Sequence, residues 1–122
     1  MVLFLQLDSH QMEYTLNCVD FGQGDDKAFP VKIKSGQSVG ELKKAIKNEN
    51  ENENAYNGID AKHLTLYRHN VDTYDPETFE CKEADKLLPL KEMSACFGDL
   101  NPPLKGAINI VVLLPRSKSI YP

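Results

Sequence analysis

The sequence AINIVVLL at residues 107–114 alternates between two faces that are both apolar. One face carries Ile108, Ile110, Val112 and Leu114, and the other carries Val111 and Leu113. A strand that is apolar on both faces lies inside a sheet, where both of its faces are covered. These residues are therefore predicted to form a central closing strand.

Two further strands are predicted near the start of the chain. Residues 12–19 alternate, with Met12, Tyr14, Leu16 and Cys18 on one side and polar residues on the other. This period of two indicates a half-buried strand. Residues 29–34 repeat the pattern after the turn sequence GQGDD at 22–26. Glycines suit such a turn, so the two strands are predicted to form a hairpin with Pro30 on an edge strand.

The middle of the chain predicts two helices and one more strand. Ser38 and Glu41 have the spacing of a capping box, and apolar residues recur at helical spacing until about residue 48. Residues 63–68 are predicted to form the third strand, with Leu64 and Leu66 facing inward. Leu90, Met93 and Phe97 form the stripe of a short second helix that Gly98 would cap.

This order of elements predicts an α+β fold of the β-grasp type. The mixed sheet would have four to five strands, with the last strand parallel to the first and the main helix packed across one face. At 122 residues the chain has the size of one domain. We place the domain at residues 12–115, with 1–11 as an N-terminal extension and 116–122 as a C-terminal tail.

Composition argues against several classes of function. The formal net charge is −4, whereas non-specific nucleic-acid binding relies on clustered Lys and Arg. The basic residues Lys43, Lys44 and Lys47 are interpreted as a solvated helix face. No segment has the length of a transmembrane helix. The apolar run at residues 2–5 lacks a basic flank and a cleavage site, so it makes a poor signal peptide.

No catalytic or cofactor site is predicted. Cys18, Cys81 and Cys96 have no CxxC spacing and read as free thiols, and no histidine stands at zinc-ligand spacing from them. The acidic residues between 72 and 80 lack the pattern of a calcium loop. No nucleophile has a base that the fold would bring beside it. We therefore expect no enzyme, no cofactor and no metal.

Several blocks of the sequence, in order, resemble one known family, the N-terminal header domain of Crinkler effectors. The blocks lie at residues 29–31, 38–47, 60–68, 87–94 and 109–115. The resemblance covers residues 12–115 and implies a ubiquitin-like fold. It also implies a secreted protein that is delivered into a host cell, where the family's variable C-terminal domains act, often in the nucleus.

The family's oomycete members carry the motif LFLAK in this domain. The matching positions here are Leu66, Tyr67, Arg68, His69 and Asn70, and only the leucine is retained. The aromatic residue followed by a basic one resembles the fungal branch of the family.

A protein-binding surface is predicted on the face of the sheet opposite the main helix. This face would carry Val111 and Leu113 from the central strand, with Tyr67 and Thr65 beside them. A contiguous exposed apolar patch usually marks an interface. The alternative is that the loop at residues 70–86 folds over this face, with Phe79 as the covering side chain.

The leading hypothesis is a non-enzymatic header domain that binds an unidentified protein partner, or a second copy of itself, during delivery into a host cell. One alternative is a conjugated ubiquitin-like modifier, which requires a C-terminal Gly-Gly, and this sequence ends Tyr121-Pro122. The other is a binding adaptor that stays inside the producing cell.

Overall fold

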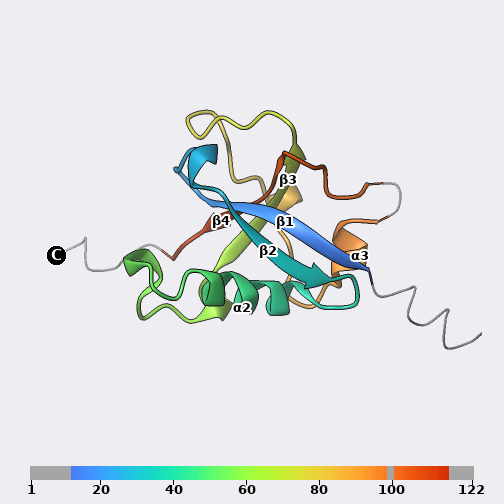
Figure 1. The fold of residues 1–122 in the computed structure, drawn as a ribbon, viewed down its shortest axis with the longest axis horizontal. Coiled ribbons are helices and arrows are strands. Elements are labelled where there is room, and N and C mark those ends of the chain that lie inside the picture. The colour runs from blue at the N-terminus through green and yellow to red at the C-terminus, as the bar shows by residue number, and fades with distance from the viewer. Residues whose placement is uncertain (1–11, 99–100, 116–122) are drawn as a thin grey trace, which may run out of the picture.

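The computed structural model describes residues 12–98 and 101–115 and contains a mixed sheet with one main helix (Figure 1). The sheet order is β2-β1-β4-β3, and β1 runs parallel to β4 while the other pairs are antiparallel. The strands are β1 (Glu13–Asp20), β2 (Phe29–Lys34), β3 (Thr65–Val71) and β4 (Ile108–Leu113). The predicted α+β architecture is confirmed, with the closing strand at the centre of the sheet.

The main helix α2 (Val39–Glu49) begins where the sequence predicts it and ends one residue later than predicted. Ser38 Oγ accepts a hydrogen bond from the backbone N–H of Glu41, and the Glu41 carboxylate accepts one from the backbone N–H of Ser38. This reciprocal pair satisfies two donors that a helix start leaves open. The buried face of the helix packs across the sheet with Val39, Leu42 and Ile46.

The second helix, α3 (Met93–Cys96), is shorter than the predicted stripe. Met93 and Phe97 are buried, whereas Leu90 lies outside the helix with 93% of its surface exposed. The preceding segment instead pairs with the edge of the sheet: the Leu87 N–H donates to the Leu66 carbonyl, and Lys86 forms an isolated bridge with Tyr67. That segment, residues 86–88, therefore occupies the position of a short fifth strand and is called the fifth-strand segment below.

The third strand begins at Thr65 and not at His63, which ends a 3-10 turn (Ala61–His63). It continues to Val71 through a register shift against β4 between Arg68 and Val71. Asn70 takes a left-handed backbone conformation within this shift, with φ of 51°. The shift has a consequence for β4, because Ile108 packs on the opposite side of the sheet from Ile110, contrary to the strict alternation that the sequence suggests.

A buried asparagine network holds this irregularity. The Asn109 side chain is fully buried; its Oδ1 accepts from the Asn17 N–H, and its Nδ2 donates to Asn70 Oδ1 and to the Leu104 carbonyl. Asn70 Oδ1 also accepts from the Leu104 N–H, and its Nδ2 donates to the Pro102 carbonyl. Because each buried amide atom has a partner, the network fixes the segment before β4 against the shifted end of β3.

Two apolar clusters lie on the two faces of the sheet. The larger one fills the space under α2 and contains Ile110, Val112 and Leu66 among its fully buried members. The smaller one, on the opposite face, contains Val19, Tyr67, Ile108 and Val111. Figure 1 shows α2 on one side of the sheet and the yellow loop after β3 on the other.

Tyr56 completes the larger cluster from a segment for which the sequence predicts no element. The ring is 1% exposed, and the hydroxyl donates to the Asp20 carboxylate at the end of β1. Burial raises the pKa of Asp20, the Tyr56 hydrogen bond partly opposes that rise, and the charge of Glu53 adds to it. Burial and the nearby Asp20 carboxylate raise the pKa of Tyr56.

The substitution Ile110→Ala tests the central strand. Ile110 is 0% exposed, so its truncation should lower the free energy of unfolding by about 2–5 kcal/mol through the cavity that it leaves. Urea titrations followed by circular dichroism measure the change. Leu90→Ala, at the 93% exposed site, is the control and should change stability by no more than about 0.5 kcal/mol. Equal losses in the two variants would contradict the placement of β4.

The substitution Asp20→Asn tests the half-buried carboxyl of Asp20 through the pH dependence of stability. A raised pKa in the folded state means that ionisation opposes folding, so the wild type should lose stability as pH rises from about 4 through the folded pKa of Asp20. The amide that replaces the carboxyl cannot ionise and still accepts a hydrogen bond from Tyr56. The urea midpoint of the variant, relative to that of the wild type, should therefore rise as pH increases through this range. Asp26→Asn, at an exposed carboxylate in the next turn, is the matched control. A difference that does not change with pH would contradict the assignment.

Candidate interaction surface

The face of the sheet that the sequence offers as a protein-binding surface is closed in the structure. Val111 is 0% exposed and Tyr67 is 7% exposed, while Leu113 and Thr65 are partly buried. The expectation of an open apolar patch is therefore wrong for Val111 and Tyr67. The cover is the loop at residues 72–86, here called the flap, which packs Tyr74, Phe79 and Cys81 against this cluster. The alternative in which Phe79 covers the face is confirmed.

Aromatic contacts join the flap to the sheet. The Phe79 ring meets the Phe21 ring edge-on, with centroids 6.2 Å apart, and meets the His69 ring at 5.4 Å. Tyr74 contacts His69 at 5.5 Å and Phe79 at 6.0 Å. Edge-to-face pairs of this kind add about 0.5–1.5 kcal/mol each beyond the area that they bury. The flap is thus anchored through ring contacts at both β3 and the turn after β1.

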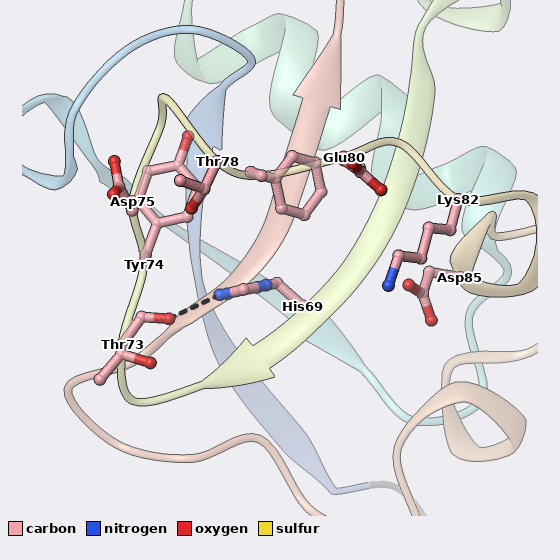
Figure 2. A pocket seen from close by; sticks show the side chains of 9 residues that line it. His69, Thr73, Tyr74, Asp75, Thr78, Glu80, Lys82 and Asp85 are labelled. Atoms are coloured by element: carbon pink, nitrogen blue, oxygen red, sulfur yellow. Dashed lines mark hydrogen bonds between the residues drawn. The ribbon is translucent and has the colours of Figure 1, made fainter.

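Two hydrogen bonds support the same arrangement. Figure 2 shows the hydrogen bond between His69 Nε2 and the Thr73 carbonyl. Its length is 2.9 Å, and it fixes the start of the flap. The Tyr74 hydroxyl donates to the Gln23 carbonyl over 3.0 Å. The Tyr74 hydrogen bond spans 51 residues of sequence, so it fixes the flap to the hairpin turn and not only to itself.

A cleft of about 350 Å³ lies along the flap (Figure 2). Its walls include the His69, Tyr74 and Phe79 rings, with the carboxylates of Asp75, Glu80 and Asp85 and the ammonium of Lys82 at its rim. The rings contact each other at 5.4–6.0 Å and do not stand apart around a central space. The cleft is therefore a by-product of how the flap packs, and it lacks the geometry of an aromatic cage for a cation.

The five positions that match the family motif do not form one site. Leu66 belongs to the core under α2, and Tyr67 belongs to the cluster under the flap. His69 contacts the flap, and Asn70 belongs to the asparagine network. Arg68 has a different environment from these four residues. Its Nε donates a hydrogen bond to the Cys96 carbonyl over 3.0 Å, and its guanidinium lies over the Phe97 ring, 5.0 Å from the ring centroid.

The helix α2 carries a basic residue that differs from the solvated face expected of it. Lys43 is 7% exposed, whereas Lys44 is exposed. Burial lowers the pKa of Lys43, and the positive charge of Lys86 lowers it further. Lys43 and Lys86 therefore bring two positive charges together beside the fifth-strand segment.

The described residues hold no assembled reactive group. Burial raises the pKa of all three cysteine thiols, which disfavours the nucleophilic thiolate. No group of three or more His, Cys, Asp or Glu side chains within residues 12–98 and 101–115 is arranged to hold a metal ion. In the same part of the chain, no helix is long and apolar enough to cross a membrane.

Comparison with known families places this fold. The model of the Crinkler effector protein N-terminal domain matches residues 14–113, which is nearly the whole of the described structure. The chain belongs to the Crinkler effector N-terminal domain family.

A curated relative and a solved structure agree with this assignment. Crinkler effector protein 1 of Rhizophagus irregularis is 36% identical over 109 residues, which cover 87% of this chain and 22% of that protein. The Crinkler domain described here thus spans about a fifth of its relative. The crystal structure of the ubiquitin-like domain of PLXNC1 covers 85% of this chain, and this chain covers 100% of that domain, with a TM-score of 0.50 at 13% identity. This likeness supports the ubiquitin-like fold.

One surface escaped the sequence analysis. A groove of about 570 Å³ lies between the fifth-strand segment and α3, and Arg68, Leu88 and Lys91 are among the residues that line it. The signal in the sequence was weak, because these residues come from segments that only the fold brings together. The nearest clue was Arg68, since a basic residue within a strand needs a partner for its charge.

The substitution Phe79→Ala tests the closure of the sheet face. Loss of the ring should cost about 1–3 kcal/mol and raise the population of molecules in which the flap has left the sheet. Hydrophobic-dye binding should rise, and limited proteolysis should cleave faster within residues 72–86. Thr78→Ala changes the neighbouring exposed residue and should leave both measurements near the wild type. Unchanged dye binding and cleavage in Phe79→Ala would contradict a flap held by that ring.

Proposed function

We propose that this chain is the non-enzymatic N-terminal domain of a secreted Crinkler effector and acts through protein contacts during delivery into a host cell. The observation that carries the proposal is the family match, which spans residues 14–113 and so includes nearly all of every described helix and strand. The relative from Rhizophagus irregularis supports it, because a matching region makes up 22% of a protein that is named an effector. A module of this kind serves a longer protein.

The structure supports contact over catalysis. The thiol pKa values are raised, and the two clefts described above are lined by side chains whose observed contacts are with the fold itself. Surfaces of this type bind other macromolecules more readily than they bind and transform a small substrate, which requires an enclosed, mostly apolar pocket. Of the four residues predicted to bind a partner, Val111 and Tyr67 can meet one only after the flap leaves the sheet, whereas Leu113 and Thr65 are partly exposed.

The delivery proposal is tested with a split fluorescent protein. One half is fused to this chain and expressed in the secreting organism, and the other half is expressed inside the host cell. Fluorescence in the host is the expected result. The ubiquitin-like domain of PLXNC1, fused in the same way, is the matched control because it shares the fold at 13% identity. Equal signals from the two fusions, or no signal from this chain, would overturn the proposal.

The kind of contact is resolved by light scattering over a concentration series. A molar mass that doubles with concentration supports self-association, and a constant mass near 13.7 kDa supports a foreign partner. Retention of the whole fusion in the producing cell, with no host fluorescence, would favour an intracellular binding adaptor.

A further inference from the structure

The Arg68 guanidinium is incompletely bonded although it is enclosed. Its Nε donates to the Cys96 carbonyl, and the Phe97 ring lies against its face. Its terminal nitrogen Nη2 is buried and has no hydrogen-bond partner among the described residues. A buried donor of a charged group costs free energy when it lacks an acceptor. The Phe97 ring offsets part of that cost. It lies against the face of the guanidinium, however, so it does not accept the N–H groups that point outward in the plane of that group.

No carboxylate within the described residues pairs with Arg68. The one ion pair in that part of the chain joins Lys86 Nζ to Glu83 at 3.6 Å. Arg68 is instead oriented by a carbonyl and a ring, both neutral. An arginine held in a fixed orientation with an unpaired Nη2 is oriented to bind a planar anion that enters the groove, because its guanidinium matches two carboxylate oxygens.

The groove that Arg68 lines combines positive charge with apolar surface. Lys86 and Lys91 flank it, Leu87 and Ala95 contribute apolar atoms, and Leu88 lies at its lip with 53% of its surface exposed. Leu90 follows two residues later and is the most exposed large apolar residue of the described chain, at 93%. Exposed leucines beside a cationic groove indicate an interface more than a solvated surface.

The charge of the groove is opposite to that of the chain. Its lining holds three cations and two carboxylates, Glu83 and Asp85, so its net charge is +1, while the whole chain has a net charge of −4. Lys43 adds a further positive charge close to Lys86. A negatively charged ligand is therefore drawn to this part of the surface.

We propose that this groove binds a peptide segment of a partner protein that presents one carboxylate beside a leucine-sized apolar side chain. The carboxylate accepts hydrogen bonds from Arg68, and the apolar side chain packs against Leu87 and Leu88. This inference rests on the proposed function, since it names the chemistry of the partner that a contact module would bind.

A carboxylate fits the groove better than a phosphate group does. The apolar share of the lining has no counterpart in an inorganic anion. Leu88 and Lys91 line the groove and are exposed, so both side chains can rotate at small cost when a ligand enters.

Selection from a displayed library of random peptides identifies the ligand and requires no candidate partner. The wild-type chain should enrich peptides in which Asp or Glu stands next to Leu, Ile or Phe, and Arg68→Gln should not enrich them. Failure of the wild type to enrich such peptides, or equal enrichment by Arg68→Gln, would overturn the proposal.

Affinities of one enriched peptide, measured by calorimetry, sharpen the result. Replacement of its acidic residue by the amide, or Arg68→Gln in the chain, should weaken binding by at least about tenfold, as expected for a charged hydrogen bond. Lys82→Gln removes one exposed positive charge outside the groove and is the matched control, expected to bind as the wild type does. An equal loss in Lys82→Gln would mean that only overall charge matters and would overturn the proposal.

Two further variants cover the remaining explanations. Lys91→Gln, exposed in the groove wall, keeps the test valid if Arg68→Gln unfolds, and should weaken binding about twofold to fivefold. Asp99 lies outside the described residues, and Asp99→Asn should bind as the wild type does. A several-fold gain in affinity for that variant would show that the chain supplies its own carboxylate, which overturns the proposal.

The peptide assay and the delivery assay can each reject one proposal without rejecting the other. Peptide binding without host fluorescence would leave the groove assigned and remove the delivery role. Host fluorescence without selection of acidic peptides would leave the delivery role and remove the groove assignment.

Discussion

The strand β4 is apolar on both of its faces, and this constraint organises the rest of the molecule. Ile110 and Val112 face α2, while Val111 and Leu113 face the opposite side of the sheet. Full burial of each such side chain contributes about 1.5–3 kcal/mol, so neither face is left in water without a large loss of stability. A single helix can cover only one of the two faces. The second cover has to come from elsewhere in the chain, and the flap at residues 72–86 provides it.

The irregular end of β3 makes that second cover possible. Asn70 takes its left-handed conformation inside the register shift, one residue before β3 ends at Val71 and the flap begins. Its side chain and that of Asn109 replace the ladder hydrogen bonds that the register shift removes, and they also hold the segment that leads into β4. Buried amides with complete partners define one register, because any slip would leave several of them unpaired. The flap is therefore anchored at its base by polar contacts and along its length by rings.

The sequence was sufficient for features that depend on local periodicity. The capping box at Ser38, the hairpin and the central position of β4 all follow from patterns of a few residues, and all three are confirmed. It was not sufficient where a residue's role depends on distant partners. Asn109 looks like an ordinary polar interruption of a strand, Tyr56 lies in a segment without a predicted element, and Lys43 looks like a solvated lysine, yet all three are buried. The choice between an open and a covered sheet face depends on whether Tyr74 and Phe79 find partners, and those partners, His69, Phe21 and Gln23, lie in other segments.

Closure of the sheet face changes where a ubiquitin-like domain of this kind can meet a partner. With Val111 and Tyr67 buried, the two most exposed large apolar residues of the described chain are Leu90 and Leu88, just after and within the fifth-strand segment. That segment pairs with β3 through few backbone contacts, and its neighbour Arg68 is held by a carbonyl and a ring, with no carboxylate of the described chain beside it. An arginine that served only to stabilise the fold would gain more from an internal carboxylate than from an unpaired nitrogen. Its present surroundings fit an acceptor that arrives from outside, so the proposed contact surface lies at the edge of the sheet and not on its face.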